Sequence, residues 1–321
     1  MSFNEKELNQ HCETILRQRK ILNKIVVLCE GVVPKEQGRL SPQSYGKMDS
    51  LPDSNFYKAC IPSDWRYSRP EFFNCGDCND VVKTYFRLLE IIDKDADNLY
   101  FRPKKIFVIV DLDIQIRSIE TYRFTDTQQI FCSLYEKSKI NEVNADETHE
   151  ILITGLIHKE AYFILPELQT IFDEYLIQPF YQAQKLNLED IYHAMSHDLS
   201  EDADLQTNFA IACSRISHCT GLDFSEIDKL KDSWIHEFQN AIDQNRKNEL
   251  IFSLLTTRKA KEYWHQIQPS SEWSRDFAVY RDQLSLAIAR DFYAKQTNDE
   301  AAAKYHIPYF FKMLRKFACD R

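Results

Sequence analysis

The chain has 321 residues, a formal net charge of −9 and the mix of apolar and charged residues that is typical of a globular protein. The acidic balance argues against a protein that coats nucleic acid through its charge. Only 6 glycines are present, and no glycine-rich phosphate-binding motif occurs among them, which argues against dinucleotide-binding and P-loop folds.

The sequence predicts neither a membrane segment nor a targeting segment. No apolar run approaches the roughly 18 residues that cross a bilayer, and the charged N-terminus lacks the apolar core of a signal peptide. The nine cysteines are odd in number and irregularly spaced, which favours reduced thiols over a disulfide framework. We therefore expect a cytoplasmic protein with no membrane partner.

The first elements are a helix, a buried strand and a long insertion. Helical spacing of apolar residues predicts a polar helix over 4–22, and a continuous apolar run predicts a strand over 24–29. That strand ends at Glu30-Gly31. Residues 32–70 are rich in proline, serine, asparagine and aspartate, so they predict an irregular insertion.

Strands and helices then alternate as far as residue 165. A short strand beginning at Glu71, a turn at Gly76 and an amphipathic helix come first, followed by a strand over 105–110, a helix over 125–138 and a strand over 150–156. Continuous β-branched runs are typical of strands that are buried on both faces. The pattern therefore predicts an α/β fold with a mainly parallel four-stranded sheet.

The second half shows a different periodicity. Apolar residues recur every four positions, as in Leu230, Trp234 and Phe238, with Ser225 as the expected N-cap. No strand-like run is present, and loops are expected near 198–206 and 266–275. We therefore predict an α/β domain over 1–168, with its insertion, and an all-helical domain over 169–321.

Acidic residues follow the two longest strands of the first half. Glu30 follows the strand at 24–29, and Asp111 and Asp113 follow the strand at 105–110. Asp111 and Asp113 are two residues apart, so in an extended segment we expect their side chains to point the same way. Parallel strands present functional groups at their carboxyl ends, and neighbouring carboxylates there favour a hard divalent cation such as Mg²⁺ or Mn²⁺. The simpler alternative is that Asp111 caps a helix and Asp113 is solvated. Glu160, after the fourth strand, has a similar alternative as an acid that favours a helix dipole.

Taken together, these motifs resemble the TOPRIM domain that topoisomerases, bacterial-type primases and OLD (overcoming lysogenization defect) nucleases share. The resemblance covers roughly residues 20–170 and consists of strand–Glu30-Gly31 followed by strand–Asp111-x-Asp113. The turn at Gly76 and the segment His158-Lys-Glu160-Ala-Tyr-Phe, similar to an Ile-Glu-x-Tyr element, resemble the OLD-type branch. The resemblance implies a metal-dependent nuclease that cuts phosphodiesters in DNA or RNA.

The resemblance also implies roles for individual residues. Glu30 would be a metal ligand or a general acid/base, Asp111 and Asp113 would hold Mg²⁺ or Mn²⁺, and Glu160 would complete a second metal position. Gly31, Gly76 and Lys159 would support these residues. A different hypothesis is a non-catalytic scaffold of the same fold, in which the helical half binds a protein partner or a second copy of the chain.

Other motifs remain open. Cys75-Gly-Asp-Cys78 precedes a helix, as a redox CxxC does, and with Cys60 it is a weaker candidate for zinc. His193 and His197 lie four residues apart, and a pair of solvated histidines is the simpler interpretation. The basic segments 258–261 and 312–316, with Arg321, are candidates for phosphate contacts, although such segments are more often solvated helix faces. Aromatic and basic residues also alternate in the insertion, where they could contact bases or pack over the sheet.

Overall fold

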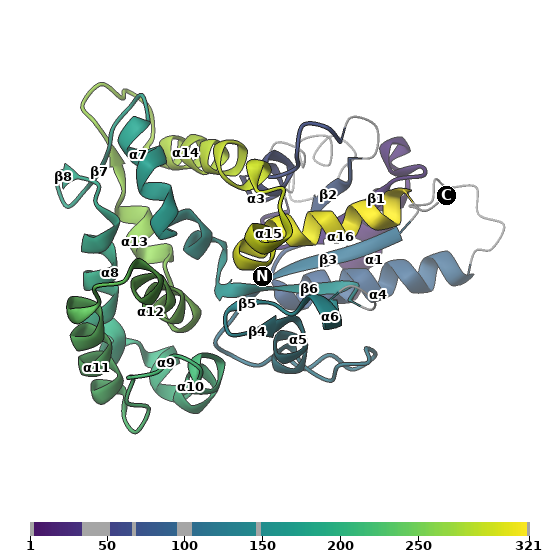
Figure 1. The fold of residues 1–321 in the computed structure, drawn as a ribbon. Coiled ribbons are helices and arrows are strands. Elements are labelled where there is room, and N and C mark those ends of the chain that lie inside the picture. Colours follow the sequence, from purple (N-terminus) through teal and green to yellow (C-terminus); the bar gives the residue numbers. More distant parts are fainter. Residues whose placement is uncertain (1–2, 34–51, 66–68, 95–104, 146–148, 320–321) are drawn as a thin grey trace.

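A computed structural model describes residues 3–33, 52–65, 69–94, 105–145 and 149–319. Its centre is a four-stranded parallel sheet in the order β2-β1-β3-β6 (Figure 1). The strands are β1 (Ile25–Cys29), β2 (Glu71–Asn74), β3 (Lys105–Leu112) and β6 (Ile151–Ile157). Their nearly continuous burial confirms the predicted parallel α/β sheet. Much of the predicted insertion, at 34–51 and 66–68, lies outside the described residues, as does Arg321.

Helices cover both faces of this sheet (Figure 1). Helices α1 (Glu5–Leu16) and α4 (Cys78–Lys94) pack against each other, and α4 contacts β3. On the other face lie α3 (Pro52–Ala59) and α16 (Ile307–Cys319), the last helix of the chain. The ring of Phe311 in α16 lies 6.1 Å from that of Phe72, and Phe317 lies 5.2 Å from Phe107. The end of the chain therefore completes the core around the first strands.

One predicted helix in the first half is shorter than expected. The segment 125–138 forms α5 (Thr127–Leu134), and the chain then turns through a hairpin of β4 (Tyr135–Glu136) and β5 (Lys139–Ile140) before α6 (Glu142–Ala145). Lys137 and Ser138 form the turn with φ of 48° and 60°. Two consecutive residues at positive φ make a tight hairpin turn, and this ends the helix early.

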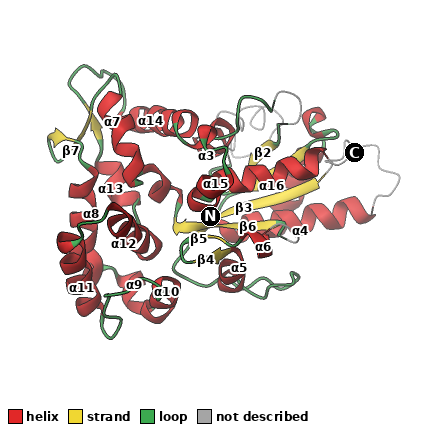
Figure 2. Ribbon diagram, viewed as in Figure 1, coloured by secondary structure: helices red, strands yellow, loops and turns green. Residues whose placement is uncertain are grey.

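The second half is mostly helical, but the prediction that it is all-helical was wrong (Figure 2). Three short strands, β7 (Pro179–Tyr181), β8 (Gln184–Lys185) and β9 (Gln268–Pro269), form an antiparallel sheet in the order β8-β7-β9. The main helices are α7 (Gln169–Glu174), α8 (Leu188–His197), α9 (Ala203–Thr207), α10 (Phe209–Ile216), α11 (Ile227–Asn240), α12 (Gln244–Thr257), α13 (Lys261–Gln266), α14 (Phe277–Asp291) and α15 (Asp299–Tyr305). Strands of two or three residues are too short to show an alternating pattern.

Several predicted details of the second half also differ. The N-cap position of α11 is occupied by Glu226 rather than Ser225, and the expected loop at 198–206 contains a 3-10 turn (Asp198–Glu201) and α9. Hydrophobic side chains from both halves belong to one buried cluster. The division into domains at residue 168 stays a prediction. No described helix is long and apolar enough to span a membrane.

Candidate functional site

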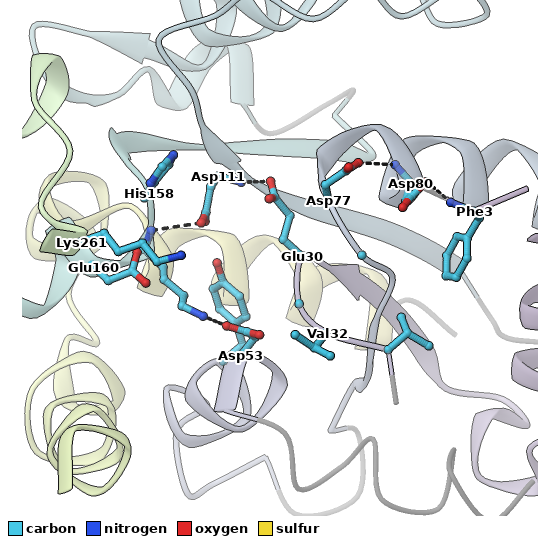
Figure 3. A pocket seen from close by; sticks show the side chains of 15 residues that line it. Phe3, Glu30, Val32, Asp53, Asp77, Asp80, Asp111, His158, Glu160 and Lys261 are labelled. Carbon is cyan, nitrogen blue, oxygen red and sulfur yellow. Dashed lines mark hydrogen bonds and ion pairs between the residues drawn. The ribbon is translucent and has the colours of Figure 1, made fainter. Parts of the chain in front are cut away.

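A cavity of about 690 Å³ lies at the carboxyl ends of β1 and β3, beside the segment that follows β6 (Figure 3). It is lined by acidic side chains and by three basic ones. The acids are Glu30, Asp53, Asp77, Asp80, Asp111 and Glu160, and the bases are His158, Lys159 and Lys261. The structure therefore brings together three of the four predicted metal ligands, Glu30, Asp111 and Glu160.

Glu30 and Asp111 are linked directly across neighbouring strands. The Asp111 backbone N–H donates to Glu30 Oε1 over 2.9 Å, because β1 and β3 run parallel and end side by side. Burial raises the pKa of Glu30 to about 7, against the Asp111 hydrogen bond that lowers it, and nearby Asp113 and Asp77 raise it further. Burial also raises the pKa of Asp111 well above its usual range, and the charges of Glu30 and Glu160 add to the rise.

The third acidic group comes from a strained turn after β6. His158 has φ 59° and ψ 156°, a region that is populated almost only by glycine. This conformation starts the 3-10 turn Lys159–Phe163 and directs the Lys159 N–H to Asp111 Oδ2, 3.2 Å away. Backbone strain of this kind costs about 1–3 kcal/mol and concentrates at functional sites.

Glu160 is the acid of the cavity with the fewest contacts to its carboxylate among the described residues. Its residue is only 7% exposed, and its carboxylate forms no hydrogen bond or ion pair with any residue that the structure describes. Its side chain lines the cavity, where the carboxylate can contact solvent or a bound ion. Glu160 is the second residue of a 3-10 turn rather than the start of the helical segment expected from the sequence.

Asp113 does not line the cavity, which corrects the prediction that it points the same way as Asp111. Strand β3 ends at Leu112, and the register between β3 and β6 shifts between Val110 and Leu112. Beyond that irregularity Asp113 Oδ2 accepts from Arg117, 3.3 Å away, and its Oδ1 accepts weakly from the Gln115 N–H at 3.5 Å. Asp113 still acts on the site through its charge, which raises the pKa of Glu30.

The two glycines that were predicted to support the site pair with each other. Gly31 and Gly76 exchange two backbone hydrogen bonds of 2.9 Å, which join the ends of β1 and β2. Gly31 has φ 147°, and a Cβ there would collide with the side chains of Asn74 and Asp53. Gly76 has φ 89°, and its Cβ would lie 2.6 Å from Asp80 Oδ2. Only glycine allows this close approach without displacing the acids.

The first turn of α4 forms the wall beside this bridge. Asp77 Oδ1 accepts from the Asp80 N–H over 3.0 Å, and Asp80 Oδ1 accepts from the Phe3 N–H over 3.1 Å. Asp77 therefore caps the start of α4, and Asp80 holds the backbone of Phe3 against that helix. They differ in this respect from Glu160.

Several charged residues of the cavity were not among the predicted site residues. They are Asp53, Asp77, Asp80 and His158, while Lys261 was predicted only as part of the basic segment 258–261. Asp53 comes from α3 and forms an ion pair with Lys159, while Lys261 comes from the start of α13 and forms no ion pair with the described residues. His158 belongs to the segment His158-Lys-Glu160-Ala-Tyr-Phe but was given no role, although its position two residues before Glu160 could have indicated one. Nothing in the local sequence of Asp53 or Lys261 indicates that either reaches β1 and β3.

The carboxylates of the cavity fit a divalent cation that keeps several water ligands better than a metal ion that is held mainly by side chains. Within the described ranges, no three His, Cys, Asp or Glu side chains are arranged closely enough to hold a metal ion. Mg²⁺, however, usually keeps several waters and binds through one or two carboxylates together with substrate phosphate. Glu30 and Asp111 supply two carboxylates whose mutual repulsion a cation would offset.

The CxxC segment does not have the features of an activated thiol. Cys75 and Cys78 are both free, and burial raises the pKa of each thiol, whereas a reactive cysteine has a lowered pKa. Cys75 is fully buried, with its Sγ 3.3 Å from His11 Nε2. These contacts are those of a cysteine that packs in a core.

The comparisons with known proteins identify no relatives. No family model matches the chain, and neither the search of curated proteins nor the search of solved structures found a match. The chemistry of the cavity is therefore the basis for a functional assignment.

Proposed function

We propose that the protein is a divalent-metal-dependent phosphodiester hydrolase, most simply a TOPRIM-type nuclease acting on DNA or RNA. One observation carries the proposal. Glu30, Asp111 and Glu160 converge on one cavity at the carboxyl edge of a parallel sheet, and none of them forms an ion pair with a described cationic side chain. This arrangement favours binding of an external cation.

Five charged residues of the cavity have distinct parts in the proposed reaction. Glu30 and Asp111 would hold Mg²⁺ or Mn²⁺, which supplies charge stabilisation and lowers the pKa of bound water. Glu160 lies beside them as the ligand for a second position. Lys261 has no described ion-pair partner and can contact a non-bridging phosphate oxygen. Lys159 is held by Asp53 and adds positive charge to the same wall.

A second candidate, a non-catalytic scaffold of the same fold, is favoured by a separate observation. Asp113 is engaged by Arg117 instead of lining the cavity, which leaves fewer carboxylates at the site than the resemblance implies. The two candidates differ in one testable respect. A scaffold would show no cation-dependent cleavage, whereas a nuclease would.

Cleavage of supercoiled DNA, and of RNA in parallel, tests the proposal with Mn²⁺, with Mg²⁺ and with EDTA. The variant Asp111→Asn removes one charge from the cavity with little change in volume. Asp173→Asn is the matched control, because Asp173 lies on α7 in an exposed ion pair with Lys185. We expect cleavage only with a cation and a loss of about 100-fold or more in Asp111→Asn alone. Absence of cleavage in the parent, or equal rates in parent and Asp111→Asn, would refute the proposal for these substrates.

A further inference from the structure

His306 is a fully buried histidine at the junction between α15 and α16. It is 0% exposed, with φ 61° and ψ −62°, a strained conformation for a residue other than glycine. Its ring lies against Gly155 in β6, where an added Cβ would collide with the ring and with Tyr135. The glycine in the middle of a buried strand is therefore explained by the space that this histidine needs.

The imidazole links two distant segments through hydrogen bonds. Its Nε2 lies 2.9 Å from the Ser138 carbonyl oxygen, and its Nδ1 lies 2.8 Å from the hydroxyl of Tyr162. A carbonyl oxygen only accepts, so Nε2 carries the hydrogen. Burial lowers the pKa of His306 to about 4, so the ring is neutral at pH 7 and Nδ1 accepts from Tyr162. The Tyr162 hydroxyl in turn accepts from the Gly155 N–H over 2.8 Å.

Tyr162 belongs to the 3-10 turn that carries Lys159 and Glu160 into the cavity. The same turn is held by two further hydroxyls from the second half of the chain. Tyr293 donates to the Tyr162 carbonyl and Tyr192 donates to the Ile164 carbonyl, each over 2.6 Å. No hydrogen bond or ion pair from another residue of the turn holds the Glu160 side chain. Its position therefore depends on how the backbone of the turn is anchored.

We propose that His306 is a positioning residue, which holds Tyr162 and thereby fixes Glu160 and Lys159 at the candidate site. The second half of the chain is then part of the site's construction, since the third acidic motif is anchored from α15 and α16. The consequence for catalysis rests on the proposed function. The anchoring itself does not, and it can be measured separately.

The test compares four variants by amide hydrogen exchange and by cleavage kinetics. Tyr162→Phe and His306→Phe remove the hydrogen bonds but keep an aromatic ring. His306→Gln keeps one acceptor and one donor, as the neutral imidazole has. Tyr280→Phe is the matched control, because its buried hydroxyl donates a single 2.7 Å bond to the Ile177 carbonyl away from the cavity.

We expect the amides of residues 158–164 to exchange about 10-fold faster or more in Tyr162→Phe and His306→Phe, and at close to the parent rate in His306→Gln and Tyr280→Phe. In an active parent, kcat should fall more than KM changes in the first two variants and recover in His306→Gln. If the amides of residues 158–164 exchange at the parent rate in both Tyr162→Phe and His306→Phe, the inference is overturned, whether or not the parent cleaves nucleic acid. Faster exchange in Tyr162→Phe and His306→Phe, together with a parent that cleaves nothing, would overturn the proposed function and leave the anchoring established.

Discussion

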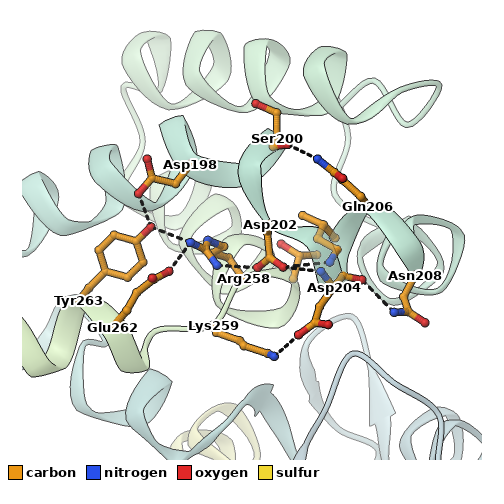
Figure 4. Close-up of polar contacts among 12 residues, drawn as sticks. Asp198, Ser200, Asp202, Asp204, Gln206, Asn208, Arg258, Lys259, Glu262 and Tyr263 are labelled. Carbon is orange, nitrogen blue, oxygen red and sulfur yellow. Dashed lines mark hydrogen bonds and ion pairs between the residues drawn. The ribbon is translucent and has the colours of Figure 1, made fainter.

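Two clusters of acidic residues in this protein are built in opposite ways. In the cluster around Arg258 (Figure 4), every acid has a donor: Asp202 pairs with Arg258 Nη1 at 2.5 Å, Asp204 pairs with Lys259, and Asp198 accepts from Tyr263 over 2.6 Å. In the cavity at the sheet edge, Glu30 and Asp111 have only backbone donors, and Glu160 has no described partner. Among the residues that the structure describes, the acids of the first cluster have charged or hydroxyl donors, whereas Glu30, Asp111 and Glu160 have no cationic partner.

The pKa values follow this difference. The side-chain hydrogen bond from Lys259 lowers the pKa of Asp204, whereas burial raises the pKa values of Glu30 and Asp111. The contacts of the Arg258 cluster join the segment 198–204 to α12 and α13, whereas the Glu30 and Asp111 carboxyls have no cationic partner among the described residues. The ion pairs of this cluster also reduce the number of residues in the basic segment 258–261 that can contact phosphate. Arg258 and Lys259 are occupied by acids, which leaves Lys261 as the lysine that faces the cavity.

The largest expected effect on stability is at the Arg258 cluster. Arg258→Ala leaves Asp202 buried without its cation, since the two side chains are only 10% and 7% exposed. Removing one partner of a buried pair costs about 3–5 kcal/mol of the free energy of unfolding. Urea unfolding measures this loss, with the exposed Arg275→Ala as control. A loss below about 1 kcal/mol would show that the two clusters do not differ in this way.

The next largest effect on stability is expected at Gly31, whose backbone pairs with that of Gly76. Gly31→Ala places a Cβ against Asn74 and Asp53 at φ 147°. We expect a loss of about 2–3 kcal/mol in urea unfolding, from backbone strain and collision. The same variant should weaken cation binding, because Asp53 pairs with Lys159 on the cavity wall. Stability within about 0.5 kcal/mol of the parent would contradict the need for glycine there.

Glu30→Gln should stabilise the protein at alkaline pH, in contrast to most core substitutions. The pKa of Glu30 is raised from 4.5 to about 7, so the folded state binds more protons than the unfolded state between these values. Stability therefore falls as pH rises through this window, and the variant removes that fall. Thermal unfolding in EDTA should show a gain of about 1–2 kcal/mol at pH 8 and none at pH 4.

The matched comparison for Glu30→Gln is Asp204→Asn. The pKa of Asp204 is lowered, so its carboxylate contributes stability above the pKa of the unfolded state, and this contribution is lost as pH falls through the folded value. The amide variant should therefore be less stable than the parent at pH 8. Effects of the same sign in both variants would remove the distinction between the two clusters.

The smallest expected effect is at Asp113. Its ion pair with Arg117 is partly exposed, with side chains 26% and 37% accessible, so Asp113→Asn should change the free energy of unfolding by less than about 1 kcal/mol. Cleavage should also fall less than in Asp111→Asn. A loss of cleavage equal to that of Asp111→Asn would show that Asp113 turns into the cavity when a cation binds.

The sequence predicted the parts of the site that local patterns encode. Continuous apolar runs define β1 and β3, and the residues that follow such runs, Glu30 and Asp111, must lie at the carboxyl edge of a parallel sheet. The supporting role of Gly31 and Gly76 was predicted from the TOPRIM resemblance, which rests on the same strand ends. Asp113 was placed incorrectly because two-residue alternation holds only while the strand continues, and β3 ends at Leu112.

The residues that were missed depend on long-range packing. Asp53 reaches the cavity because α3 folds back over β2, and Lys261 reaches it because α13 packs against the turn that follows β6. His306 is separated from Tyr162 by 144 positions, and no periodicity connects them. Such contacts are set by the tertiary fold, which the spacing of residues along the chain does not record.

Binding of Mn²⁺ to the metal-free protein tests the central claim most directly, because it needs no assumed substrate. Titration followed by electron paramagnetic resonance should show saturable binding to the parent and to Asp173→Asn. The affinity should be lower by about 10-fold or more in Asp111→Asn and in Glu30→Gln, since each loses one of two carboxylate ligands. No saturable binding to the parent, or equal affinity in all four proteins, would contradict a cation site at this edge of the sheet.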